Sequence, residues 1–579
     1  MDTELTGQER EMCRNRILSN DYFDIIKDFT VPPAEPESSA ADYCIETITR
    51  DYGIIHVARE GLPLLDYVNY SYTLMPVLYT TVLDGAAVSG TAQQSYERSL
   101  EASGILTVQG PPLSLTGRGV LIGYIDTGID YRNATFRYSN GDTRIAAIWD
   151  QSIQTGTPPE GFLYGSEYRT EDINLALQSS DPYSIVPSRD ENGHGTAIAG
   201  TQAAPEATIA MVKLKPAKPY LREFYRVRED ALAYQETDVL MAIKYLDLLA
   251  ASRNQPLAIC FGLGTNMGDH SGTSVSSYYM NQISDKEGRV IVVAGGNEGN
   301  AGHHFYGELK STPENAEIRV GENETGFMME LWGRNPDVFS ISVKSPGGEV
   351  IPRVMPQKRF SGEYGFVFEK TRVSIDYILT ERSAGDELVM IRFLNPTPGI
   401  WTIGVYGEVD PYIGENAYIF GTYHIWLPIR GFISDDTYFL LPNPDVTITE
   451  PAYTEKVISL STYQAENTSF YIDSGRGYSR EGRIIPDLSA PGVGVLTAGG
   501  EGRMRVTGSS MAAGITAGAA AQFLEWAVVQ GNMPRIRAQD MKYYMIRGAV
   551  RDNRLTYPNR QWGYGRMNIL GAFEAMRGI

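Results

Sequence analysis

The sequence is poor in cysteine and has no long apolar run. Its 579 residues include three cysteines, Cys13, Cys44 and Cys260, whose spacing fits neither a zinc site nor a disulfide framework. No run of about 18 apolar residues occurs, so no transmembrane helix is expected. The polar, acidic residues 1–10 lack the basic and apolar regions of a secretory signal. We therefore expect synthesis in the cytoplasm.

Positive charge is also scarce. The chain has 70 acidic and 50 basic residues and a net charge of -20, which argues against a nucleic-acid partner or an anionic membrane surface. With 42% apolar residues, the chain is long enough for a large core and more than one domain.

Three patterns divide the sequence. Residues 1–95 suggest a small α+β unit, and its end (84–95) is small and polar, as at a domain boundary or a proteolytic site. Residues 96–308 and 445–579 alternate strand-like and helix-like segments, which predicts an α/β fold with a doubly wound, mostly parallel sheet. Residues 309–444 contain short strands with hardly any helical period, which predicts an inserted antiparallel sandwich or jelly roll. We expect this module to stabilise the fold; oligomer contact and substrate docking are the alternatives.

Two candidate site residues stand at the ends of predicted elements. The apolar run 120–125 predicts a buried parallel strand, and it ends in Asp126 at the edge where open α/β sheets place their chemistry. A turn-capping aspartate is the alternative. His194 lies between two glycines, which allow close backbone approach and expose the imidazole. The remaining histidines lack such flanks and are interpreted as structural: His56, His270, His303, His304 and His424.

Two more candidates lie further along the chain. Ser510 opens an Ala/Gly-rich segment, 511–529, that predicts a buried helix, whose N-terminus favours developing negative charge. The alternative is an N-cap serine. Asn297 lies in a Gly-rich turn after the predicted strand 290–294, as either a turn residue or an amide donor.

These motifs together resemble the subtilisin-like serine proteases, or subtilases. They are Ile-Asp-Thr-Gly around Asp126, Gly-His-Gly-Thr around His194, Ala-Gly-Gly-Asn ending at Asn297 and Gly-Ser-Ser-Met-Ala-Ala around Ser510. Their order along the chain, Asp then His then Ser, is that of subtilisin. The resemblance implies a serine endopeptidase in which Asp126, His194 and Ser510 are catalytic. It assigns the oxyanion hole to the Asn297 amide and the Ser510 N–H group.

The resemblance also implies how substrate binds. It places a substrate-binding strand at Phe261, Gly262, Leu263 and Gly264, whose backbone would pair with an extended protein or peptide substrate. It indicates no metal or cofactor, and Asn133-Ala134 replaces the usual His-Pro after the Asp motif, so calcium is not indicated.

A closer resemblance is to the clostridial germination-specific, Csp-like subtilases. The features shared with them are a region of about 95 residues before the protease, the segment 148–151 and the inserted β module. This resemblance implies that residues 1–95 are a pro-domain, acting as intramolecular chaperone and inhibitor, that stays bound in the cleft after self-cleavage. We expect the cut at Gln94–Ser95. It also implies activation of a spore germination hydrolase precursor and association with a spore.

Two other functions compete with this interpretation. A catalytically silent subtilase scaffold, acting as a binding or signalling protein, is the main alternative. An esterase or lipase is disfavoured because Gly-x-Ser-x-Gly is absent around Ser510.

Overall fold

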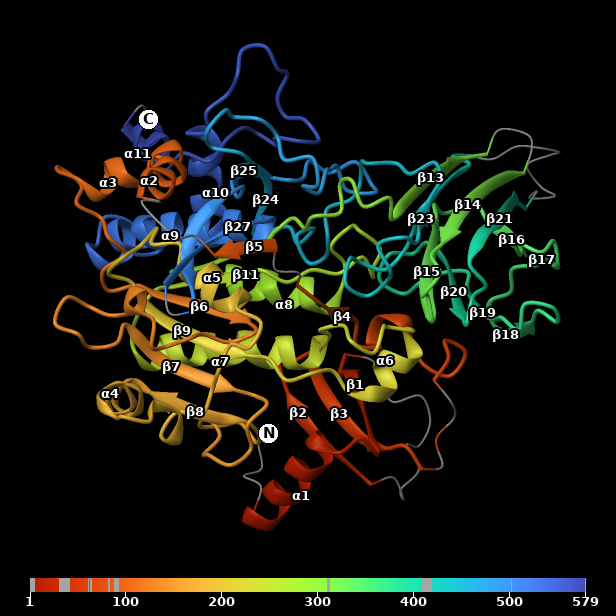
Figure 1. The fold of residues 1–579 in the computed structure, drawn as a ribbon, viewed down its shortest axis with the longest axis horizontal. Helices are drawn as coiled ribbons and strands as arrows, with labels where there is room; N and C mark the ends of the chain where they lie inside the picture. The colour runs from red at the N-terminus through yellow and green to blue at the C-terminus, as the bar shows by residue number, and fades with distance from the viewer. Residues whose placement is uncertain are drawn as a thin grey trace.

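An eight-stranded sheet forms the centre of the protease part of the chain in a computed structural model (Figure 1). The structure describes residues 6–30, 42–60, 62, 65–81, 84–87, 93–309, 313–408, 419–500 and 502–577. In spatial order the strands are β25 (Leu488–Pro491), β24 (Ile458–Tyr463), β12 (Arg289–Ala294), β11 (Leu257–Phe261), β6 (Leu121–Asp126), β9 (Thr208–Lys213), β7 (Ile145–Asp150) and β8 (Ser166–Arg169). All pairs are parallel except β7 with β8. The predicted mostly parallel sheet is therefore confirmed.

Helices cover both faces of this sheet. Every residue of β6 is buried, and its side chains alternate between two cores. Leu121 and Ile125 pack in the core that includes α7 (Glu236–Ser252) and α8 (Val275–Ser284). Ile122 and Tyr124 pack in the opposite core. That second core includes α5 (His194–Ala199), α9 (Ser509–Leu524), α10 (Ala538–Arg547) and α11 (Ile569–Arg577), with α4 (Thr170–Gln178) at its edge.

Helix α9 continues as a π-helical turn, Glu525–Val529. Among the described residues, the combined segment Ser509–Val529 is the one helix with the length and composition of a membrane span, and an 18-residue stretch of it has a mean hydropathy of 1.3. However, 83% of that 18-residue stretch is buried inside the protein, because every residue of α9 packs in the core. Burial in the core accounts for its apolar composition.

The N-terminal unit has its own small sheet, of order β1 (Tyr22–Asp28), β3 (Tyr52–Ala58) and β2 (Tyr43–Thr47). Helix α1 (Gly7–Leu18), which our sequence analysis did not predict, begins with a capping box between Thr6 and Glu9. Cys13 and Cys44 form a disulfide that joins α1 to β2. The expectation that the cysteines form no disulfide was therefore wrong for this pair, because only the fold brings the two residues together.

The segment after this unit runs into the protease part. Strand β4 (Leu78–Tyr79) pairs with β10 (Tyr234–Gln235), which follows α6 (Pro219–Phe224). Strand β5 (Asp84–Ala87) is the third strand of a sheet with β26 (Val495–Gly499) and β27 (Gly502–Thr507). Helices α2 (Gln93–Ala102) and α3 (Ile105–Gln109) follow. The small, polar composition of this segment suggested a soft boundary, but its described parts form a strand and a helix.

The inserted module consists of two antiparallel sheets, at the right of Figure 1. One has the order β13 (His304–Glu308), β22 (Thr422–Trp426), β15 (Gly326–Gly333), β20 (Glu387–Leu394), β19 (Arg372–Ile378) and β18 (Arg359–Gly365). The other has the order β17 (Val350–Val354), β16 (Phe339–Lys344), β21 (Gly399–Gly407), β14 (Glu314–Val320) and β23 (Tyr438–Phe439). Apolar side chains from both sheets share one core. The first strand begins at His304, slightly before residue 309.

Candidate active site

The structure brings Asp126 and His194 into contact. Asp126 ends β6, and β11 lies beside it with Phe261 opposite Ile125, so the two strand ends form one edge of the sheet. His194 begins α5, and its Nδ1 lies 2.8 and 2.9 Å from the two Asp126 carboxylate oxygens. Gly195 permits this approach, because a Cβ there would lie 2.0 Å from the Gly128 oxygen.

The contact sets the chemistry of the imidazole. Burial disfavours the charged ring, but the Asp126 carboxylate more than offsets this and raises the pKa of His194 above its ordinary 6.5. A proton on Nδ1 leaves Nε2 of the neutral ring as the free base. Nε2 is buried and has no hydrogen-bond partner among the described residues. The imidazole can therefore accept a proton there.

Ser510 and Asn297 meet at the start of α9. The Ser509 N–H group donates to Asn297 Oδ1 over 2.9 Å. This bond fixes the amide orientation and leaves Nδ2 available as a donor beside Ser510. The sequence left Asn297 open as a turn residue or an amide donor, and this geometry favours the donor.

The close packing of helix α9 against helix α5 explains the glycine at position 514. A Cβ at Gly514 would lie 2.6 Å from the Ile198 oxygen, so α9 packs directly against α5 at this point. That close contact holds the helix of Ser510 against the helix of His194.

The predicted substrate strand borders a small pocket beside Ser510. Its volume is about 70 Å³, and Gly262, Leu263 and Gly264 line it, whereas Phe261 is buried in the core behind it. Thr449, which our sequence analysis did not identify, lies between Gly264 and Gly296. A Cβ on either glycine would come within 2.6 Å of the Thr449 side chain.

The hydroxyl of Thr449 is buried and has no hydrogen-bond partner among the described residues. Thr449 therefore limits the depth of this pocket and presents an oxygen to it. No local sequence pattern marks this threonine, because it follows the inserted module and reaches the pocket only through the fold.

The chain's own N-terminal segment occupies the groove in front of this pocket. The Thr80 N–H group donates to the Gly264 oxygen and the Gly264 N–H group donates to the Thr80 oxygen, both over 3.1 Å. Strand β5 pairs with β27, and Asp84 lies opposite Thr507, which lines the same pocket. The backbone contacts of this segment with Gly264 and with β27 are those of an extended peptide added to exposed strand edges.

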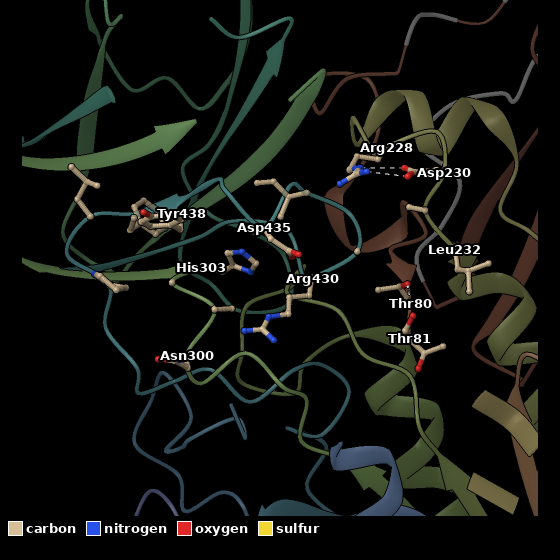
Figure 2. Close-up of a pocket in the computed structure, with 18 residues that line it drawn as sticks. Thr80, Thr81, Arg228, Asp230, Leu232, Asn300, His303, Arg430, Asp435 and Tyr438 are labelled. Atoms are coloured by element: carbon tan, nitrogen blue, oxygen red, sulfur yellow. Dashed lines mark hydrogen bonds and ion pairs between the residues drawn. The ribbon is translucent and has the colours of Figure 1, made fainter. Parts of the chain in front are cut away.

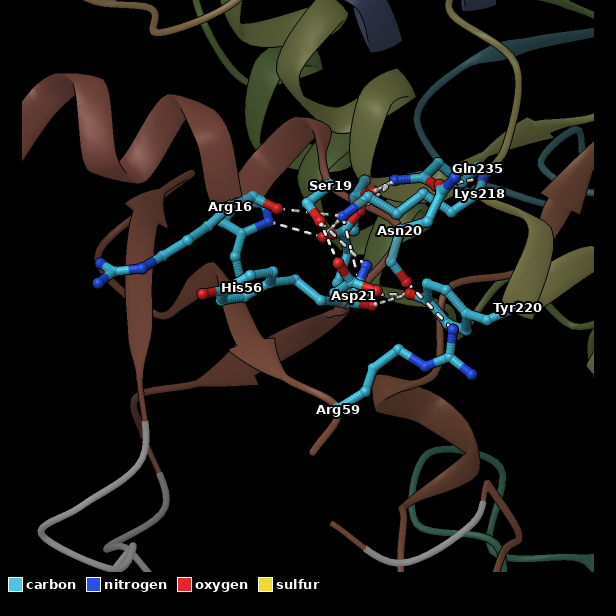
Figure 3. Close-up of polar contacts among 12 residues, drawn as sticks. Arg16, Ser19, Asn20, Asp21, His56, Arg59, Lys218, Tyr220 and Gln235 are labelled. Carbon is cyan, nitrogen blue, oxygen red and sulfur yellow. Dashed lines mark hydrogen bonds and ion pairs between the residues drawn. The ribbon is translucent and has the colours of Figure 1, made fainter. Parts of the chain in front are cut away.

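A buried charge network joins the N-terminal unit to the protease part (Figure 3). Asp24, only 1% exposed, lies 2.7 Å from His56 Nδ1 and accepts hydrogen bonds from Lys218 Nζ (2.7 Å) and Gln235 Nε2 (2.8 Å). Glu46 lies 3.1 Å from the other imidazole nitrogen. Burial opposes charge here, but Asp24 and Glu46 raise the pKa of His56 to about 9. His56 and Lys218 hold the pKa of Asp24 well below its ordinary range, against the effect of burial.

The other histidines lie in packed surroundings. His303 Nδ1 lies 2.6 Å from Glu298, and His270 stacks on Trp426. His304 and His424 contact each other at 2.9 Å. Their structural interpretation agrees with these contacts. Within the described residues, no three His, Cys, Asp or Glu side chains form a group that could hold a metal ion.

Comparison with known proteins agrees with this geometry. Residues 117–326 and 441–565 match the subtilase family model, which leaves out most of the inserted module. The solved structure of the Clostridium perfringens CspB protease is 32% identical, with a TM-score of 0.73, and covers 83% of this chain and 97% of that chain. No curated protein sequence matches this chain.

Two other solved structures are similar at lower identity. Fervidolysin from Fervidobacterium pennivorans, a keratinolytic enzyme, is 11% identical over 96% of this chain and 61% of that chain, with a TM-score of 0.46. The epidermin leader peptide processing protease EpiP from Staphylococcus aureus is 12% identical over 96% of this chain and 99% of that chain, with a TM-score of 0.44.

The chain belongs to the subtilase family. It is a subtilisin-like serine endopeptidase, a hydrolase whose substrates are peptides, and it is similar to the CspB protease over most of its length.

Proposed function

We propose that Ser510, His194 and Asp126 hydrolyse peptide bonds through an acyl-enzyme, and that the first bond they cut lies in this chain. The observation that carries the proposal is the reciprocal backbone pairing of Thr80 with Gly264. Because of this pairing, the chain's own segment lies in front of Ser510 as an extended substrate would.

The proposed reaction needs only groups of the chain and a water molecule. Ser510 Oγ attacks the carbonyl carbon while His194 Nε2 takes the hydroxyl proton, and Asp126 stabilises the imidazolium that forms. Asn297 Nδ2 and the Ser510 N–H group donate to the oxyanion. The C–N bond then breaks, His194 gives its proton to the leaving amine, and an ester remains on Ser510. Water, activated by His194 in the same way, hydrolyses that ester. No cofactor enters these steps.

The register of the bound segment supports a window of three bonds for the self-cleavage. Thr80 pairs with Gly264, and Asp84 pairs with Thr507. Gly264 and Thr507 both line the pocket beside Ser510, so we propose that the cut falls between Thr81 and Asp84. The bond expected from sequence, Gln94–Ser95, instead falls within helix α2.

We further propose that residues N-terminal to the cut are a pro-domain that remains docked and inhibits the enzyme. Three observations support this: the Thr80–Gly264 pairing, the pairing of β4 with β10, and the buried contact of Asp24 with Lys218. By resemblance to the germination-specific subtilases, we propose a spore cortex hydrolase precursor as the physiological substrate, with spore association of the enzyme.

Mass spectrometry of the purified full chain tests the self-cleavage. We expect a new N-terminus at residue 82, 83 or 84 and an uncut chain in Ser510→Ala. The matched control is Ser509→Ala, which removes the neighbouring hydroxyl but keeps the proposed nucleophile and should still be cut. A cut chain in Ser510→Ala would contradict self-cleavage, and a new N-terminus at Ser95 would contradict the register.

A second assay tests the proposed substrate. The purified enzyme is incubated with an inactive cortex hydrolase precursor encoded in the same genome. We expect one defined cleavage that generates hydrolase activity and is absent with Ser510→Ala. An intact precursor, incubated with enzyme that cleaves other peptides, would contradict this substrate.

A further inference from the structure

A second, larger cavity adjoins the groove and includes residues of the inserted module (Figure 2). Its volume is about 1090 Å³, slightly above the roughly 300–1,000 Å³ typical of ligand pockets. It is lined by the bound N-terminal segment at Thr80 and Thr81, by residues within 228–232 and by residues 300–303 of the protease part, and by residues within 430–442 at the end of the module.

Two residues of the bound segment, Thr80 and Thr81, border this cavity. The Tyr79 ring packs edge-on against Phe261, with 5.7 Å between ring centroids, and its hydroxyl contacts Ser276 at 3.3 Å. Side chains alternate along an extended strand, so the next residue, Thr80, faces away from Phe261. Thr80, only 2% exposed, and Thr81 both line the cavity, and their small side chains leave most of that volume unfilled.

Not every charged side chain at the cavity has an ion-pair partner. Arg228 forms two hydrogen bonds with Asp230, of 3.1 and 2.9 Å, and Arg430 faces Asp473 at 3.6 Å. Asp435, contributed by the inserted module, is exposed and forms no ion pair or hydrogen bond with the described residues. The charge left without a partner at this cavity is therefore negative.

We propose that this cavity is a specificity subsite for a long basic side chain, lysine or arginine, at the substrate residue whose backbone pairs with Gly264. The inserted module forms part of the wall of the subsite and contributes Asp435 as the partner of the cation. The inference rests on the proposed function, because it takes the bound Thr80 segment as the model for a substrate in the groove.

The test uses synthetic peptides that copy residues 74–87, with Arg, Ala or Glu in place of Thr80, and the full chain as the enzyme. We expect kcat/KM for the Arg peptide to exceed that for the Ala peptide by about two- to fivefold, as for a partly exposed ion pair. The Glu peptide should be the slowest. Asp435→Asn should remove the preference for the Arg peptide over the Ala peptide. The matched control is Asp436→Asn, which changes a neighbouring exposed aspartate that does not line the cavity.

Equal rates for the three peptides would overturn the subsite. A preference for Glu would overturn the choice of a basic side chain. It would indicate that the arginines of the cavity, Arg228 and Arg430, bind the substrate side chain. If the bound segment blocks all peptides, the same three substitutions are made at Thr80 in the full chain and the rates of self-cleavage are compared, with the same order expected. A chain that cuts neither itself nor any peptide contradicts the proposed function, whereas a chain that cuts all variants equally contradicts only this subsite.

Discussion

Replacing Lys218 should loosen the N-terminal unit, because Lys218 is the lysine of the protease part in direct contact with Asp24. Four buried charges meet there: Asp24 and Glu46 are negative, and His56 and Lys218 are positive. Lys218→Met retains most of the side-chain volume but leaves this group with a net negative charge in the docked state. Once the units separate, water can solvate Asp24, so the penalty falls on docking.

The expected loss of docking free energy follows from the burial of Lys218 and Asp24, whose side chains are 4% and 1% exposed. Breaking a buried pair by removing one partner costs about 3–5 kcal/mol. At about 1.36 kcal/mol for each factor of ten, docking should weaken roughly 10²- to 10⁴-fold. Adding Asp24→Asn removes the uncompensated charge, so the double variant should dock more tightly than Lys218→Met alone.

Native mass spectrometry of the self-cleaved protein, over a dilution series, measures retention of the N-terminal fragment. Lys456→Met serves as the control, because Lys456 pairs with Asp285 on the partly exposed surface of the protease part. Unchanged retention in Lys218→Met would refute the reasoning that this buried pair holds the two units together.

Three further predictions concern the reaction. Asn297→Ala removes the proposed side-chain oxyanion donor and should lower kcat/KM about 10²- to 10³-fold in peptide assays; a loss below tenfold would contradict that role. Catalysis needs the neutral imidazole of His194, whose pKa is raised by Asp126, so activity should increase with pH through a midpoint above 6.5. In Asp126→Asn the residual activity should show a lower midpoint, and an unchanged pH profile would contradict this cause. Thr449→Gly deepens the pocket beside Ser510 and should shift peptide-library cleavage toward larger residues before the cut bond, whereas Thr449→Val, of similar volume, should keep the size limit.

Much of the protease architecture could be predicted from local sequence. The apolar run of β6 is buried at every position, and its end brings Asp126 to the sheet edge where His194 meets it. These features were predictable because a buried parallel strand, a Gly-flanked histidine and a small-residue helix each leave a short sequence signal.

Features that depend on tertiary contact could not be predicted. Nothing near Cys13 or Cys44 indicates that α1 and β2 meet. The small, polar residues that suggested a soft boundary include β5, whose strand conformation depends on pairing with β27, far along the chain. The partners Asp24 and Lys218 are likewise 194 positions apart and become neighbours only through docking.

Labelling of the full-length protein with a fluorophosphonate, followed by peptide mapping, tests the central claim most directly. The account predicts one adduct, on Ser510, that Ser510→Ala abolishes and His194→Ala strongly slows, with faster labelling in Lys218→Met because the groove opens more often. No adduct on Ser510, even after the N-terminal fragment has been removed, would contradict the assignment of Ser510 as the nucleophile.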